Sequence, residues 1–127
     1  MFHLILYQPE IPPNTGNVIR LCANTGVALH LVEPLGFDLE EKKLRRAGLD
    51  YGYLGCVQTF ASVDVCLETR GQPRVFALST RGTTRYDTPG YKAGDAFLLG
   101  PETRGLPQAV LDALPPEQCL RLPMRPD

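Results

Sequence analysis

Short apolar runs of β-favouring residues alternate with helical patterns along the whole chain, and this alternation restricts the fold more than any other feature. Elements that alternate at this spacing indicate βα units, in which the strands form one parallel sheet flanked by helices. Strands covered on both faces read as nearly continuous apolar runs. The expected strands cover 2–7, 28–32, 55–60, 74–79, 97–99 and 119–122, and the expected helices cover 14–25, 38–48, 62–70 and 107–114.

Glycine, proline and capping residues mark the boundaries between these elements. Asn14 is a good N-cap for the first helix, and Gly26 stands where a left-handed residue ends a helix. The successive prolines at positions 12 and 13 are expected to keep the segment before Asn14 out of regular structure. Ser62 is expected to cap the third helix, and residues 80–87 are expected to form a loop.

Length and composition describe one ordinary globular domain, residues 1–127. Hydrophobic residues make up 43% and charged residues 21%, and no run approaches the ~18 apolar residues that span a membrane. Residues 1–10 lack the basic start of a signal peptide, so we expect a cytoplasmic protein. The formal net charge is −1, and a nucleic acid would therefore have to be held by local basic patches.

The cysteines and histidines do not follow a metal-binding pattern. None of the four cysteines belongs to a CxxC pair, and the two histidines, His3 and His30, lie on separate expected strands. We therefore expect no metal site. The cysteines are best interpreted as small buried thiols in a reducing compartment.

The strongest candidate for a binding loop follows the expected strand at 97–99. Gly100 and Gly105 bound a loop that holds Glu102 and Arg104. Glycine lets the backbone approach a ligand closely or take a positive φ, and ligands of open α/β sheets sit at the carboxyl ends of strands. No Lys-Ser or Lys-Thr pair follows the second glycine, which excludes a P-loop. The alternative is a tight connection whose charges only face water.

The first helix has an unusual polar face. At about 100° per residue, three amides and one cation fall in a stripe about 120° wide. Such a combination is rare on one helix face. A structural ion pair with Glu102 is the plain interpretation of its cation, Arg20. The stripe consists of Asn14, Asn17, Arg20 and Asn24.

Three strand exits are expected to lie along one edge of a parallel sheet: residues 78–80, 100–105 and 122–124. Proline-bounded backbone at such an edge offers unpaired carbonyls and amides to a planar ligand such as adenine, and Leu78, Leu122 and Met124 would supply apolar walls.

A further segment is basic: four cations occupy five positions in 42–46. Phosphate contact and plain solvation explain that segment equally well.

Six stretches resemble the SPOUT-class tRNA ribose 2′-O-methyltransferases, in particular the small type that modifies the wobble nucleotide. They run in order through essentially the whole chain. The resemblance implies an α/β fold with a trefoil knot at its C-terminal end, S-adenosylmethionine held in that knot, and a homodimer. It also implies methyl transfer to the ribose 2′-hydroxyl of a wobble cytidine or modified uridine of tRNA. The stretches are LYQPEIPPNTGNVIRLCANTG, EPLGF, KKLRRAGLDY, FALSTRGT, GPETRGLP and RLPMRPD.

The resemblance also assigns roles to single residues. The first family motif, N-x-G-N-x-x-R, falls on 14–20 and the second on 100–106. Together with the strand exits and the basic segments, these matches predict three groups of site residues. They are the catalytic residues Asn14, Asn17 and Arg20; the donor-binding residues Leu78, Ser79, Thr80, Gly100, Pro101, Glu102, Gly105, Leu122 and Met124; and the RNA-binding residues Lys42, Lys43, Arg45, Arg46, Arg81 and Arg104.

The third family motif is a Ser/Asn-rich loop that leads into a last helix. It should follow Asp127, where the sequence stops. That piece would supply part of the donor site, the threaded end of the knot and much of the dimer interface. We therefore do not expect the 127-residue form to be fully active.

The implied chemistry limits what Arg20 can do. Methyl transfer from a sulfonium requires the two partners to be held in line and the ribose hydroxyl to lose its proton. The family commonly gives the part of the base to the motif arginine, here Arg20. A guanidinium with a pKa above ~12 is a poor proton acceptor. We expect Arg20 instead to bind the neighbouring phosphate and stabilise the developing alkoxide, while phosphate or water takes the proton.

Two other functions stay open from the sequence. A non-catalytic RNA-binding or assembly protein with the same core would bind tRNA without transferring a methyl group, and the end of the chain before the third motif favours it. A flavodoxin-like nucleotide-binding enzyme would hold a phosphate at the N-terminus of the first helix. It is disfavoured because no Gly-rich phosphate loop follows the first strand.

Overall fold

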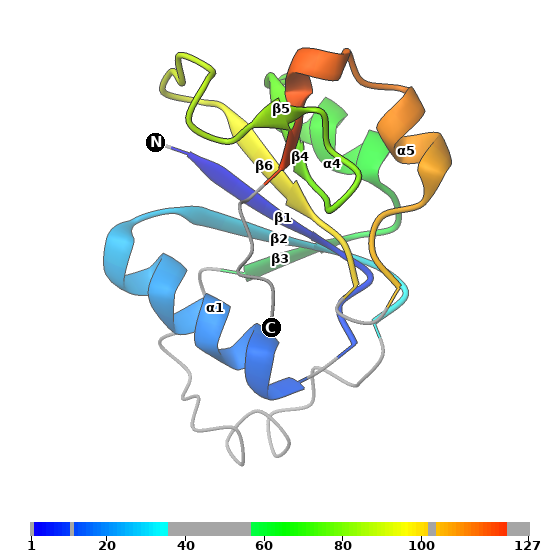
Figure 1. Cartoon of the computed structure of the whole chain (residues 1–127). Coiled ribbons are helices and arrows are strands. Elements are labelled where there is room, and N and C mark those ends of the chain that lie inside the picture. Colours follow the sequence, from blue (N-terminus) through cyan, green and yellow to red (C-terminus); the bar gives the residue numbers. More distant parts are fainter. Residues whose placement is uncertain (1, 11, 36–56, 102–103, 122–127) are drawn as a thin grey trace, which may run out of the picture.

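The computed structural model describes residues 2–10, 12–35, 57–101 and 104–121. Within these ranges the strands form one sheet in the order β3-β2-β1-β6-β4-β7-β5, and every pairing is parallel. The predicted class, a parallel sheet flanked by helices, is confirmed (Figure 1). The strands are β1 (His3–Tyr7), β2 (Ala28–Val32), β3 (Val57–Phe60), β4 (Val75–Leu78), β5 (Thr84–Arg85), β6 (Ala96–Leu99) and β7 (Cys119–Arg121). The helices are α1 (Pro12–Thr25), α4 (Val63–Thr69), α5 (Gln108–Asp112) and the 3-10 turn η1 (Pro116–Gln118).

Helix α1 begins two residues earlier than predicted. The expectation that Asn14 caps the helix and that the prolines stay outside was wrong, because Pro12 and Pro13 form its first turn. Proline is tolerated there because the first N–H groups of a helix have no acceptor within it. The other end was predicted correctly: Gly26 has a φ of 77°, and its N–H donates to the Cys22 carbonyl oxygen at 2.9 Å.

Two further predictions for local structure can be compared with the fold. Ser62 caps α4 as predicted, and its Oγ accepts the N–H of Val65 at 3.1 Å. The expectation of a plain loop over 80–87 was wrong, because β5 lies there and pairs with β7. A strand of two residues is too short to show a periodic pattern. The helix expected at 38–48 lies outside the described residues.

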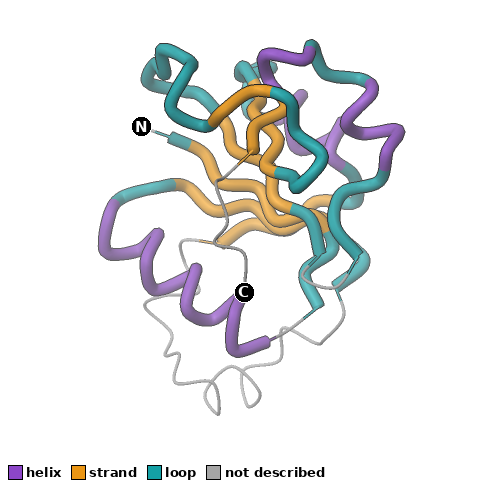
Figure 2. Tube along the Cα trace, in the orientation of Figure 1, coloured by secondary structure: helices purple, strands orange, loops and turns teal. Residues whose placement is uncertain are grey.

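The helices cover the two faces of the sheet, with α1 on one side and α4 and α5 on the other (Figure 2). Successive residues of β1 point to opposite faces: Ile5 belongs to the core under α4 and α5, while Leu6 packs under α1. Burial on both faces explains why the strands read as apolar runs. The free cysteines of the described ranges are buried as predicted: Cys22, Cys66 and Cys119.

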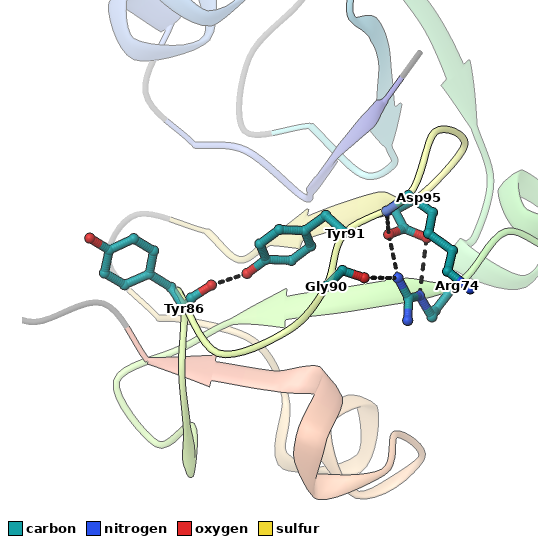
Figure 3. Close-up of polar contacts among 6 residues, drawn as sticks. Arg74, Tyr86, Gly90, Tyr91 and Asp95 are labelled. Carbon is teal, nitrogen blue, oxygen red and sulfur yellow. Dashed lines mark hydrogen bonds and ion pairs between the residues drawn. The ribbon is translucent and has the colours of Figure 1, made fainter.

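A bidentate ion pair fixes the edge of the sheet where β4 and β6 begin (Figure 3). The Nε and Nη2 of Arg74 donate to the two carboxylate oxygens of Asp95 at 3.1 and 2.7 Å, and Nη2 also donates to the Gly90 carbonyl oxygen at 2.8 Å. The Lys92 N–H donates to the same carboxylate at 2.7 Å. These bonds to Arg74 and to the backbone hold the pKa of Asp95 below its usual range. The pair thereby fastens the loop before β6 to the start of β4.

Two histidines meet on the α4 face, which their positions on separate strands did not indicate. His30 lies opposite Ile5 in the register, and His3 is two residues from Ile5 on the same strand face. The His3 Nδ1 and the His30 Nε2 are 3.0 Å apart. Burial, with a smaller contribution from Arg70, lowers the pKa of His30 to about 4. His30 is therefore neutral in the folded protein near pH 7.

The tautomer of His30 follows from its neighbours. Its Nδ1 is buried without a hydrogen-bond partner, so a proton on that atom would leave a buried donor unsatisfied. A proton on Nε2 avoids this cost, because that N–H can donate to the His3 Nδ1. With the proton on Nε2, only the lone pair of the His30 Nδ1 has no partner. The hydrogen bond to His3 then stabilises the neutral form of His30.

The lowered pKa of His30 predicts how stability depends on pH. Between pH 6.5 and about 4 the unfolded chain binds a proton that the folded chain does not, so the free energy of unfolding falls as the pH falls through this window. The loss by pH 4 is about 3 kcal/mol. Urea unfolding at a series of pH values, compared between the parent protein and His30→Leu, measures it. Equal pH slopes for the two proteins between pH 6.5 and 4.5 would contradict the prediction.

The Arg74–Asp95 pair predicts a second effect on stability. Asp95→Asn removes an acceptor that binds both Arg74 and the Lys92 N–H, and we expect a loss of roughly 1–3 kcal/mol because the site is buried. Asp87→Asn is the matched control, since Asp87 pairs with Arg85 at 3.0 Å on the exposed surface. Thermal unfolding of both variants should show a clear decrease for Asp95→Asn alone. Equal melting temperatures would refute the role of the pair.

Candidate functional site

The carboxyl ends of β6, β4 and β7 are neighbours in the sheet, as the interpretation of three strand exits requires. The register aligns Leu78 of β4 with Leu99 of β6 and with Leu120 of β7, so the chain leaves the three strands at one level. The predicted donor-binding residues in the described ranges lie at the end of β4 or in the loops that follow β4 and β6. They are Leu78, Ser79, Thr80, Gly100, Pro101 and Gly105. Glu102, Leu122 and Met124 lie outside the described residues.

The two glycines of the loop after β6 have different reasons to be glycine. Gly105 has a φ of 69°, which residues with a Cβ rarely adopt. Its N–H donates to the Pro101 carbonyl oxygen at 2.9 Å. A Cβ at Gly100 would lie 2.4 Å from the Leu106 backbone nitrogen. The close approach at Gly100 is therefore made by its own loop, whereas the sequence had suggested a ligand.

A second tight turn follows β4. The Ser79 N–H donates to the Leu120 carbonyl oxygen at 3.0 Å, and the Gly82 N–H donates to the Ser79 carbonyl oxygen at 3.1 Å. A Cβ at Gly82 would lie 2.3 Å from the Leu120 carbonyl oxygen. The turn is thus fastened to β7 through contacts that only glycine permits at position 82.

Arg81 connects this turn with the loop after β6. Its Nη1 donates to the Gln108 Oε1 at 2.6 Å, and its Nη2 donates to the Leu106 carbonyl oxygen. Its backbone N–H donates to the Ser79 Oγ at 3.1 Å. The sequence predicted an RNA contact for Arg81; the structure shows partners within the chain, and the RNA contact stays a prediction.

Helix α1 turns part of its polar stripe outward. Asn17 is exposed and Arg20 is half-buried, and the Arg20 Nη1 donates to the Asn17 Oδ1 at 3.0 Å. Ile19, on the opposite side, is buried against the sheet. Asn14 lies in the first turn of α1, and its side chain is outside the description, as is Glu102, the alternative ion-pair partner for Arg20. The structure thus brings together two of the three predicted catalytic residues.

Arg104 connects the loop after β6 with the segment between β1 and α1. Its Nη2 donates to the Gln8 Oε1 at 3.3 Å, and its Nε lies 3.6 Å from the Glu10 Oε2. Gln8 has a φ of 47°, a left-handed conformation that is costly for a residue with a Cβ. The sequence gave no glycine signal there, and both Gln8 and Glu10 were missed. These contacts join the second predicted motif to the segment that precedes the first, at the neighbouring exits of β1 and β6.

The remaining predictions concern cations, metals and membranes. Lys42, Lys43, Arg45 and Arg46 lie outside the described residues. In the parts of the chain that the structure describes, His, Cys, Asp and Glu side chains form no group of three or more that could hold a metal ion. None of the helices in those parts is both long enough and apolar enough to cross a membrane.

Comparison with known proteins agrees with this geometry. The model of the SpoU rRNA Methylase family matches residues 1–127. The chain is 54% identical over 127 residues to the tRNA (cytidine(34)-2'-O)-methyltransferase of Methylovorus glucosotrophus (strain SIP3-4), covering 100% of this chain and 82% of the relative. It is also 54% identical over 127 residues to the protein of the same name from Escherichia coli (strain K12), of which it covers 81%.

A solved structure described as structural insights into the 2-OH methylation of C/U34 on tRNA superposes with a TM-score of 0.87. It shares 46% sequence identity, and the match covers 100% of this chain and 82% of that one. The family resemblance seen in the sequence is thereby confirmed over its whole length. The chain belongs to the SpoU methylase family.

Proposed function

We propose that this protein transfers a methyl group from S-adenosylmethionine to the ribose 2′-hydroxyl of the wobble nucleotide of tRNA, a cytidine or a modified uridine. The proposal rests above all on the 54% identity over 127 residues to a relative named tRNA (cytidine(34)-2'-O)-methyltransferase. That alignment covers all of this chain and so includes both the stripe on α1 and the three strand exits.

The strand exits fit the adenosine part of S-adenosylmethionine. Leu78 and Gly100 lie at adjacent exits and are both half-buried, so the edge offers an apolar wall beside accessible backbone. S-adenosylmethionine supplies a methyl group on a positively charged sulfur when it is bound. The donor site that we assign consists of Leu78, Ser79, Thr80, Gly100, Pro101 and Gly105, with Glu102, Leu122 and Met124 added from the family resemblance.

Arg20 acts on the nucleotide that receives the methyl group. Its guanidinium donates to the neighbouring phosphate and to the ribose oxygen as that oxygen gains negative charge. Asn17 accepts one N–H of Arg20 at 3.0 Å and so orients the guanidinium. The hydroxyl proton passes to phosphate or water. Asn14, on the same helical stripe, contributes a further amide to this side of the site.

The partners follow from the same proposal. Arg104 is exposed at the carboxyl edge, and together with Lys42, Lys43, Arg45 and Arg46 it supplies the local positive charge that tRNA requires on a chain of net charge −1. The protein acts in the cytoplasm. A second copy of the chain completes a homodimer, for which the 60% exposed side chain of Leu21 on α1 offers an apolar contact.

The role of Arg20 predicts a kinetic effect without a loss of donor binding. Arg20→Ala should slow single-turnover methyl transfer to tRNA by roughly 100- to 1,000-fold, because it removes an interaction made in the transition state. Donor affinity from calorimetry should stay nearly unchanged. Arg20→Lys keeps the charge but loses the planar fork, and a severe loss there would indicate bidentate contact. Near-normal transfer by Arg20→Ala would end the catalytic assignment.

The donor site predicts the effect of truncating Leu78. Leu78→Ala should weaken S-adenosylmethionine binding about tenfold, since it removes roughly 1–2 kcal/mol of apolar contact. Val65→Ala is the control, because Val65 is an apolar side chain that is 45% exposed on α4. Gly100→Val should weaken donor binding strongly, because a side chain at position 100 would clash with Leu106 of the same loop. Unchanged donor affinity in Leu78→Ala would move the pocket elsewhere.

A further inference from the structure

Arg81 lies where the turn after β4, the loop after β6 and strand β7 come together. Its backbone belongs to the turn after β4, and the first residue of that turn, Ser79, is hydrogen-bonded to Leu120 of β7 at 3.0 Å. Its side chain reaches Leu106, at the end of the loop after β6, and Gln108, the first residue of α5. Arg81 therefore connects the turn after β4, which is itself bonded to β7, with the loop after β6.

The acceptor on Leu106 belongs to the part of the loop that closes on Gly100. Leu106 is 2% exposed, and its backbone nitrogen lies 2.4 Å from the position that a Cβ of Gly100 would take. Leu106 and Gly100 are therefore close backbone neighbours within one loop, so a contact that holds Leu106 also bears on the surroundings of Gly100. Pro107, the N-cap of α5, makes no side-chain capping bond. The side chain of Arg81 attaches the start of α5 and the end of the loop after β6 to the turn after β4.

The chemistry of these contacts suits positioning. Both acceptors of the Arg81 side chain are uncharged, so the bonds do not neutralise its charge but hold two oxygen atoms at a fixed spacing. A planar guanidinium holds two acceptors in this way, whereas the single ammonium of lysine does not reproduce the fork. Arg85, four residues later, instead forms an exposed ion pair with Asp87.

We infer that Arg81 is a positioning residue of the methyl-donor site. Its guanidinium keeps the turn after β4 and the loop after β6 at the separation that lets Leu78 and Gly100 contact the donor together. This role rests on the proposed function and deepens it. It differs from the RNA contact predicted from the sequence, because the side chain would act on the donor through the protein backbone and not on tRNA.

The test compares Arg81→Ala and Arg81→Lys with Arg85→Ala in the full-length protein. Arg81→Ala should raise the Kd and the KM for S-adenosylmethionine about tenfold or more, with kcat at saturating donor and the tRNA affinity within about twofold of the parent. Arg81→Lys should not restore donor affinity, because charge alone does not supply the fork. Arg85→Ala should bind donor and tRNA like the parent protein.

A readout without ligand tests the same role. Amide hydrogen exchange in the ligand-free protein should become faster at 79–84 and 104–110 in Arg81→Ala, while β1 and β2 keep their protection. Unchanged exchange in these two segments would overturn the inference. So would weakened tRNA binding that Arg81→Lys restores, with donor affinity unchanged, since that pattern describes a phosphate contact.

Failure of the two proposals can be told apart. If the parent protein bound no S-adenosylmethionine, the proposed function would fail, and the exchange experiment would still decide whether Arg81 holds the loop. If Arg81→Ala lowered the melting temperature but left the KM for the donor unchanged, the residue would be structural only. That result would overturn the positioning role and leave the proposed function intact.

Discussion

The parallel pairing of β6, β4 and β7 is the constraint on which the rest of the site depends. In a parallel sheet every strand leaves at the same edge, so the chain must return across a face before it can add the next strand. The returning segments bury both faces, and the exits gather at one edge at one level, as the alignment of Leu78 with Leu99 and Leu120 shows. Segments that are distant in sequence thereby meet without any local signal for contact.

Different kinds of hydrogen bond stabilise the sheet where its central strands begin and where they end. At the edge where β4 and β6 begin, the Arg74–Asp95 pair combines charge with buried hydrogen bonds, and such a site is costly to disturb from either side. At the carboxyl edge, arginines donate mainly to neutral oxygens, as in the contacts of Arg81 with Leu106 and of Arg104 with Gln8. Bonds of this kind fix geometry with little change in local charge, which suits the binding of a cationic donor and an anionic nucleic acid that we propose for this edge.

The sequence predicted most of the fold because burial on both faces of a strand leaves a continuous apolar run, as in β1, β2 and β4. It failed where tertiary pairing decides, since β5 exists only through β7, and where proline is tolerated, at the start of α1. The polar stripe on α1 could be predicted because helical spacing brings Asn17 and Arg20 together. The His3–His30 contact and the partners of Arg81 depend on register and loop closure, for which a single sequence carries no periodic signal. The knot stays a prediction from the family resemblance.

Residues that touch no reacting atom set the position of those that do. An in-line displacement depends steeply on distance and angle, and a misplacement of about 1 Å can cost about 100-fold in rate. In the proposed mechanism, Asn17 orients the guanidinium of Arg20 on the acceptor side, while Arg81 holds the backbone around Gly100 on the donor side. The two contacts lie on different elements, α1 and the turn after β4, so their losses should separate kinetically: one lowers the rate at saturating donor, and the other lowers affinity for the donor itself.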